Sequence, residues 1–222
     1  MCVGVFDEIL EKNANNQLTL IPHNNDMIWM FGKIYRRSFI NKYNIRFHPT
    51  SRANEDNGFN TICRLCSNEW EQINFISNHV YYWHENLNSI TRINNNQYSY
   101  GSSETDSFFG YVENMKYAIQ EAKKRKQNNE VITAWTVTCM IQFYEYYIEC
   151  CINAPEHADN NFKYCQDYYH NVYKPIAKNI SKEFFTQQYN EVMRNSYLNN
   201  KLNNIIPPIG IFDFFNLLEQ NN

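Results

Sequence analysis

The spacing of apolar residues changes near residue 100, and this change constrains the fold more than any other feature of the chain. Before it, apolar runs are short and are separated by Asn-rich turns, as in small strands and short helices. After it, apolar residues recur every three to four positions over long segments, which is the spacing of amphipathic helices. We therefore expect a mixed α/β domain at residues 1–100 and an all-α domain at residues 101–222, in a chain that is helix-dominated overall.

Within the first part, short apolar runs predict strands and helical spacing predicts two short helices. The expected strands are residues 2–6, 18–21, 73–76 and 79–83. The expected helices are residues 36–44 and a segment that begins near Asn54 and has its apolar residues on one face. The polar segment 11–17 is typical of a hairpin connection between the first two strands.

The second part carries four helical patterns and a short apolar tail. The patterns cover residues 108–122, 131–152, 158–173 and 182–198, and the tail covers residues 211–218. Ser103 and Thr105 are candidate N-caps of the first pattern. Pro175 is expected to stop the third pattern, because proline has no backbone N–H to donate. The polar residues 93–104 are expected to link the two parts.

Charge and hydropathy argue against several classes of function. The net charge of −3 does not favour a nucleic-acid partner, and the basic run at residues 123–126 fits a helix end, where cations complement the helix dipole. No apolar run is long enough for a transmembrane helix, and the first residues lack the basic and apolar regions of a signal peptide. The seven Cys lack the spacing of a disulfide framework, so we expect a cytoplasmic protein.

Cys63 and Cys66 form the only closely spaced Cys pair of the C-x-x-C kind. A structural zinc site needs four ligands, and no second pair accompanies this one. A thioredoxin-like pair opens a helix after a strand, whereas this pair falls inside a helical pattern. We therefore expect both thiols to belong to the core.

The most informative region runs from Trp29 to Thr91. Its motifs are, in order, Trp29, Gly32-Lys33, Tyr35-Arg36-Arg37-Ser38-Phe39, Ile45-Arg46-Phe47, Glu55-Asp56, Phe59, Tyr81-Tyr82 and Ser89-Ile90-Thr91. In this order and spacing, the region resembles the acceptor-binding second half of the catalytic domain of family-2 glycosyltransferases, which have the GT-A fold. The resemblance implies a partial GT-A-like domain. It also implies inverting transfer of a sugar from a nucleotide-activated donor to an acceptor hydroxyl, a hexosyltransferase type of reaction used in polysaccharide biosynthesis.

The resemblance assigns the role of catalytic base to Asp56, in the stretch RANEDNGFN at residues 52–60. A base must lie within hydrogen-bond reach of the acceptor hydroxyl to take its proton, and a helix N-terminus keeps a carboxylate ionised. Glu55 is expected to contact the acceptor or Arg52, and Gly58 to let the chain approach a ligand or a neighbouring backbone closely. The residues alone leave open that the two acids only cap a surface helix.

Five residues around this stretch are candidates for substrate binding: Glu55, Trp29, Lys33, Arg52 and Asn54. Lys33 could offset the charge that develops on a departing nucleotide diphosphate, or it could form a surface ion pair of little value. Trp29 could stack on the C–H face of a sugar ring, or it could belong to the core.

A second group of candidates, His84, Ser89 and Thr91, follows the Tyr-rich strand. The resemblance places this loop near the donor diphosphate, where some members use a His as a metal ligand. A single His is also common as a structural residue, so both interpretations stay open. His23 and Asp26 precede the Trp and could contact the acceptor.

The chain departs from the family in one respect: it contains no Asp-x-Asp. In the family this motif ends the preceding nucleotide-binding half and holds Mg²⁺ or Mn²⁺ with the diphosphate. The resemblance therefore implies that the metal ligands lie mostly outside this chain, in a missing half or a partner chain, and that the sheet has an open edge. The expected partners are a nucleotide-sugar donor and a glycan or other hydroxyl acceptor. The alternative function is a non-catalytic binding or assembly module built on the same half-domain.

Overall fold

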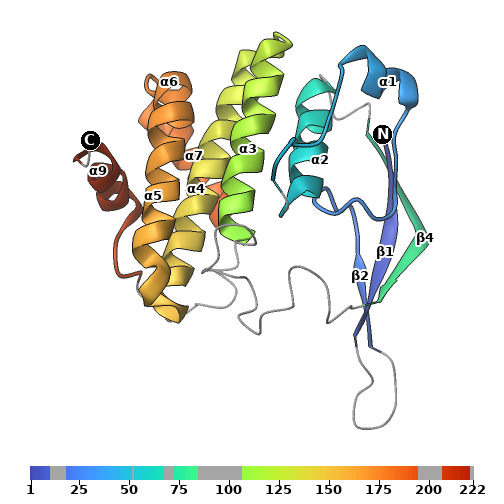
Figure 1. Cartoon of the computed structure of the whole chain (residues 1–222), viewed down its shortest axis with the longest axis horizontal. Helices are drawn as coiled ribbons and strands as arrows, with labels where there is room; N and C mark the ends of the chain where they lie inside the picture. The colour runs from blue at the N-terminus through green and yellow to red at the C-terminus, as the bar shows by residue number, and fades with distance from the viewer. Residues whose placement is uncertain (11–18, 52, 68–72, 85–106, 195–206, 221–222) are drawn as a thin grey trace.

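In the computed structural model, the chain begins with a small sheet and continues as a series of packed helices (Figure 1). The structure describes residues 1–10, 19–51, 53–67, 73–84, 107–194 and 207–220. The elements of the first part are β1 (Cys2–Leu10), β2 (Thr19–His23), β3 (Lys33–Ile34), α1 (Arg37–Lys42), α2 (Glu55–Cys66) and β4 (Asn74–His84). The helix-dominated architecture, with a small mixed α/β part before the helices, is thereby confirmed.

β1 is the central strand of the sheet, because every other described strand pairs with it. β4 pairs parallel with β1 along almost its whole length, from Cys2 opposite Asn74 to Ile9 opposite His84. β2 and β3 pair antiparallel with the opposite edge, β2 beside the end of β1 and β3 beside its start. The sequence predicted two strands where β4 runs unbroken, and it gave no sign of the two-residue strand β3.

β4 lies at the outer edge of the sheet in Figure 1 and pairs, among the described residues, with β1 alone. Its side chains are exposed along the whole strand apart from Trp83, with Val80 exposed to 49 % and Tyr82 to 56 %. The strand bulges over β1, where a Cβ on Gly4 would lie 2.6 Å from the Val80 side chain. Among the described residues, β4 therefore leaves one edge of the sheet open.

The helices of the second part are α3 (Ser107–Lys124), α4 (Asn129–Asn153), the 3-10 turn η2 (Pro155–His157), α5 (Ala158–Tyr168), the π-helix η3 (Tyr169–Tyr173), α6 (Lys174–Ala177), α7 (Lys182–Arg194) and α9 (Ile211–Gln220). They enclose one large core, in which buried rings pack edge to face, as Phe143 does on Tyr168 at 4.7 Å between centroids. The linker expected at residues 93–104 and the end of the helix expected at residues 182–198 lie outside the described residues.

Pro175 does not stop the third helix, and this prediction is wrong. The chain passes from α5 through η3 into α6, which contains Pro175 in its first turn. The π-turn widens the helix just before the proline, and the Lys174 amide donates to the Tyr169 carbonyl five residues back. The wider turn accommodates the pyrrolidine ring and its missing N–H, which a regular α-helix would not.

α2 and α3 pack side by side and join the two parts of the chain (Figure 1). Two glycines allow this close approach. A Cβ on Gly58 would lie 2.5 Å from Asn114 Oδ1, and a Cβ on Gly110 would lie 2.5 Å from the Ala53 carbonyl oxygen. The buried Asn114 amide donates to that same carbonyl, at 2.8 Å, and to Ser51 Oγ, also at 2.8 Å. Gly58 in RANEDNGFN therefore serves helix packing.

Both thiols of the C-x-x-C pair are buried in α2, as expected, among the apolar side chains between α1, α2 and α3. Burial raises the pKa of the Cys63 thiol to about 12 and that of the Cys66 thiol to about 11. At neutral pH both groups are therefore protonated, which suits a packing role and not a nucleophile.

Candidate functional site

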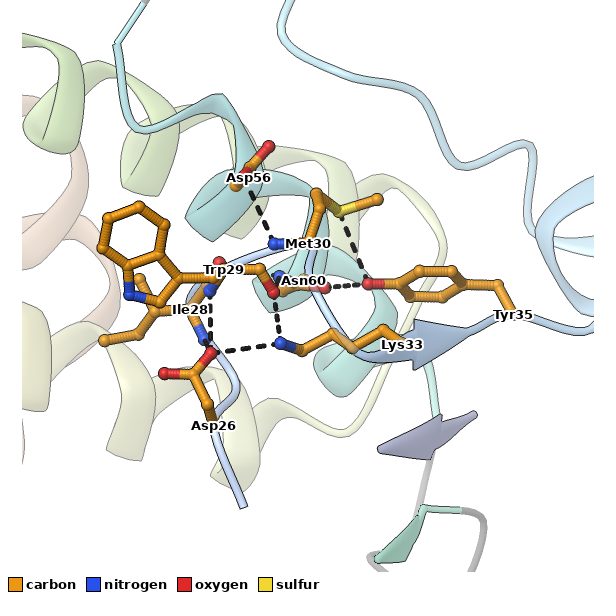
Figure 2. A network of polar contacts seen from close by, with 8 residues as sticks. All are labelled: Asp26, Ile28, Trp29, Met30, Lys33, Tyr35, Asp56 and Asn60. Atoms are coloured by element: carbon orange, nitrogen blue, oxygen red, sulfur yellow. Dashed lines mark hydrogen bonds and ion pairs between the residues drawn. The ribbon is translucent and has the colours of Figure 1, made fainter. Parts of the chain in front are cut away.

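The candidate site forms where the connection between β2 and α1 lies against the first turns of α2. A network of polar contacts joins the two segments (Figure 2); it comprises Asp26, Ile28, Trp29, Met30, Lys33, Tyr35, Asp56 and Asn60. We refer to these eight residues as the loop network. Two of its members, Asp56 and Asn60, come from α2, one helical turn apart, and the other six from residues 26–35.

Asp26 organises the start of the connection. Its Oδ1 accepts hydrogen bonds from the backbone amides of Ile28, at 3.0 Å, and Trp29, at 2.9 Å, which is the pattern of an Asx turn. The same oxygen accepts from Lys33 Nζ at 3.1 Å. Asp26 is therefore committed to folding its own loop, and this explains a residue that the sequence suggested only as a possible acceptor contact.

The Lys33 ammonium is satisfied inside the loop network. No part of its side chain is exposed, and it donates to both Asp26 and the Trp29 carbonyl oxygen. Burial lowers the pKa of Lys33, and the nearby carboxylates of Asp26 and Asp56 oppose this effect. Because its ammonium is paired with Asp26 and the Trp29 carbonyl and its side chain is covered, Lys33 holds the loop together and is not a free cation for a diphosphate.

Asn60 fastens the loop to α2, and sequence reasoning missed it. Its side chain is fully buried and its amide donates to the carbonyl oxygens of Ile28, at 2.8 Å, and Trp29, at 3.1 Å. Its own carbonyl oxygen accepts from the Tyr35 hydroxyl. The signal available in the sequence was a polar residue between Phe59 and the next apolar residues of the helix, four positions after Asp56.

Asp56 lies in the first turn of α2, as predicted. Its Oδ2 accepts a hydrogen bond from the Met30 amide at 3.2 Å, while Figure 2 shows its other oxygen directed away from Lys33 and Asp26. Burial raises the pKa of the Asp56 carboxyl above its ordinary value; the Met30 amide and the Lys33 charge offset this only in part. The group is thus a fixed, half-buried carboxylate with one oxygen outside the network.

Glu55 and Asn54 occupy the start of the same helix. Burial also raises the pKa of Glu55, and the adjacent Asp56 charge adds to the effect. Asn54 adopts the left-handed conformation with φ of 59° and does not cap α2 with its side chain. Its amide instead donates to the Ser107 carbonyl oxygen at 2.6 Å and to Ser107 Oγ at 3.1 Å, so this amide is occupied in holding α3. Arg52 lies outside the described residues.

Trp29 is packed against other aromatic side chains and is also partly exposed, so it has features of both a core residue and a surface ring that could stack on a sugar. Its ring stacks on Phe31 at 5.8 Å between centroids and packs against Trp83 at 5.6 Å and Phe6 at 6.4 Å. It nevertheless remains 37 % exposed. The ring is therefore held rigidly by neighbouring aromatic groups while part of it faces solvent, next in sequence to the Met30 amide that binds Asp56.

The second group of candidates is only partly described. His84 is exposed at the end of β4, opposite Ile9, and is not a member of the loop network. Ser89 and Thr91 lie outside the described residues. The structure therefore brings together Asp56, Glu55, Trp29, Lys33 and Asp26 from the sequence candidates, and it adds Asn60 and the Met30 amide to them.

The described residues do not fit a resident Mg²⁺ or Mn²⁺. Among them, no group of three or more His, Cys, Asp or Glu side chains is arranged to hold a metal ion. The two carboxylates of the loop network, Asp26 and Asp56, both interact with the Lys33 ammonium, and its positive charge offsets theirs. A divalent metal held by three or more such side chains would therefore need ligands from outside the described part of the chain.

Comparison with known proteins gives no relative: no protein-family model matches the chain, and neither a curated protein nor a solved structure is significantly similar to it. Among the described helices, none is both long and apolar enough to cross a bilayer.

Proposed function

We propose that this chain is the acceptor-side part of a family-2-like glycosyltransferase with a GT-A-like domain, and that Asp56 is its catalytic base. The observation that carries the proposal is the position of the Asp56 carboxylate. It lies at the start of a helix, one oxygen is fixed by the Met30 amide, and the other is directed out of the loop network. The proposal also rests on the ordered motifs between Trp29 and Thr91.

The reaction requires one proton transfer from the acceptor. The acceptor oxygen attacks the anomeric carbon, the bond to the nucleotide diphosphate breaks, and the hydroxyl proton passes to the free oxygen of Asp56. Burial raises the pKa of the Asp56 carboxyl, and its ionised form is therefore a stronger base than an ordinary Asp carboxylate. The hydrogen bond from the Met30 amide supports this role. It holds the carboxylate through Oδ2 and so fixes the direction of the other oxygen, which takes the proton.

Trp29 and Lys33 receive different roles in this proposal. The exposed part of the Trp29 ring is offered as a platform for the C–H face of the acceptor sugar. Lys33 is a positioning residue, since its ammonium binds the loop that carries the Met30 amide. Glu55, half-buried beside Asp56, is proposed to bind a second acceptor hydroxyl.

The donor half of the reaction is assigned to groups outside the described residues. Mg²⁺ or Mn²⁺ on a donor diphosphate would stabilise the leaving group. Since the residues described here do not fit such an ion, the proposal assigns it no ligand in this chain and no step.

The acceptor proposal can be tested by glycan binding. The purified protein, fluorescently labelled at its N-terminus, is applied to a glycan array, and we expect it to bind a restricted set of glycans. Trp29→Ala should lose this binding, whereas Tyr82→Ala, which removes a more exposed ring from the sheet edge, should keep it. Binding of no glycan, or equal binding by both variants, would contradict the acceptor role.

A second candidate, a non-catalytic binding or assembly module, is favoured by the open edge of β4 and its exposed apolar side chains. The coding sequence upstream of Met1 separates the two candidates. A reading frame that encodes a strand-helix pattern ending in Asp-x-Asp, in the same chain or a neighbouring one, supports the transferase. Its absence from the genome supports the module.

A further inference from the structure

A groove lies between η3, α6, the start of α7 and α9, at the opposite end of the molecule from the sheet (Figure 1). Its volume is about 560 Å³, within the range of small-molecule sites. No part of the loop network lines it. The groove is therefore independent of the function proposed for Asp56.

Five aromatic side chains form the apolar part of the groove: Tyr169, Tyr173, Phe185, Phe212 and Phe215. Tyr169 and Tyr173 stack at 5.4 Å, and Phe215 meets Tyr173 edge to face at 5.2 Å. Phe185 is buried, and its ring centroid lies 5.8 Å from that of Phe212, a residue that is 58 % exposed. The π-turn before Pro175 holds the two tyrosines against α9, so the surface is preformed.

The polar part of the groove carries a surplus of positive charge. Three lysines, Lys174, Lys178 and Lys182, and one carboxylate, Glu219, line it. Glu219 is satisfied, since it accepts from Lys174 and from the Tyr169 hydroxyl, the latter at 2.6 Å. Lys178 and Lys182 have no carboxylate within ion-pair distance among the described residues. Two cations therefore remain for a ligand.

We propose that this groove binds a small anionic amphiphile, with a phosphate or carboxylate between Lys178 and Lys182 and an apolar body on the aromatic side chains. Two lysines that line the same groove as an aromatic surface are complementary to such a ligand, because the head group gains charge-assisted contacts and the body is removed from water. A neutral apolar molecule would leave the lysines unused, and a free anion would leave the aromatic surface wet.

Isothermal titration of the whole chain with matched probes tests the proposal. The probes are octyl phosphate and 1-naphthyl phosphate, which share a head and differ in body, together with inorganic phosphate and 1-octanol. We expect at least one phosphate ester to bind with a Kd below about 1 mM. Inorganic phosphate, which lacks the body, and 1-octanol, which lacks the charged head, should each bind at least about tenfold more weakly. A preference for an alkyl or an aromatic body is shown by which ester binds more tightly.

Matched variants locate the binding. Lys178→Gln with Lys182→Gln should weaken the better ester about tenfold. Lys123→Gln with Lys163→Gln removes the same charge from exposed positions elsewhere and should leave the Kd unchanged. Phe212→Ser should weaken binding without lowering the melting temperature, since its ring is exposed. Binding of neither ester below about 1 mM, equal binding of octanol and octyl phosphate, or equal weakening by the two lysine pairs would overturn the proposal.

Discussion

The backbone amide of Met30 donates to Oδ2 of Asp56 at 3.2 Å, across 26 positions of sequence. This bond joins the connection after β2 to the first turn of α2, and it sets the direction of the carboxylate proposed as the base (Figure 2). The surrounding contacts hold that amide in place. Asp26 accepts from the Ile28 amide and from the Lys33 ammonium within the loop, and the Asn60 side chain of α2 donates to the Ile28 carbonyl.

The buried charge of Asp56 should appear in the pH dependence of stability. Because burial raises the pKa of Asp56 in the folded protein, its contribution to stability is greatest below its ordinary pKa and is lost as the pH rises through the raised value. Asp56→Asn lacks this pH-dependent contribution, because the Asn side chain does not titrate. The free energy of unfolding of the wild type minus that of Asp56→Asn should therefore fall as the pH rises through this window, and then stay constant.

Glu121→Gln is the matched control for this titration. Burial favours the neutral form of Glu121, but hydrogen bonds from Lys124 and Arg125 outweigh it and lower the pKa. The difference between wild type and Glu121→Gln should therefore rise with pH, from below the lowered pKa up to the ordinary value. Chemical denaturation of the three proteins between pH 3 and pH 8 measures both slopes. The same slope for both variants would contradict the burial of Asp56.

Lys33→Met should destabilise the protein strongly. It leaves Asp26 without its cation in a covered network, and breaking a buried pair on one side costs about 3–5 kcal/mol. Lys124→Met breaks a pair whose lysine is 70 % exposed, which should cost less than about 1 kcal/mol. Adding Asp26→Asn to Lys33→Met should recover part of the loss. Urea denaturation tests this, and equal effects of the two lysine substitutions would show that Lys33 is not enclosed.

Gly58→Ala should destabilise the protein although alanine favours helices. The new Cβ would lie 2.5 Å from Asn114 Oδ1, and overpacking of this kind costs about 1–3 kcal/mol, more than the gain of about 1 kcal/mol in helix propensity. Asn57→Ala, in the same turn but less buried, should be neutral or stabilising. Thermal unfolding of both variants measures the difference. A stabilised Gly58→Ala would mean that α2 and α3 are not in such close contact.

The helices were largely predictable from the sequence, because the spacing of apolar residues within a segment is enough to indicate a helix there. α2 begins after Asn54 and α3 and α4 fall within a few residues of the expected bounds. Pro175 was misjudged, since a π-turn is a tertiary solution that the rule for proline in an α-helix does not anticipate.

The position of Asp56 was predictable, whereas its partners were not. A carboxylate in the first turn of a helix follows from the sequence alone, but the Met30 amide has no side-chain signature. The sequence left open whether Lys33 faces a ligand or forms a surface ion pair. The ion pair that it forms is covered, which the sequence could not show because its acceptors, Asp26 and the Trp29 carbonyl, depend on how the loop folds. Spacing on α2 between Asp56 and Asn60 was the one signal that could have indicated the network.

The most direct test of the central proposal is sugar transfer by the enzyme completed with its nucleotide-binding half, comparing wild type with Asp56→Asn. The substitution keeps the size of the side chain and the oxygen that accepts from Met30, but it removes the base. We predict a loss of about 10²–10⁴-fold in turnover, with donor binding and melting temperature nearly unchanged, and a smaller loss for Glu55→Gln, mainly in acceptor KM. Near-normal turnover by Asp56→Asn would place the base elsewhere, and unfolding of the variant would show that Asp56 is a structural cap.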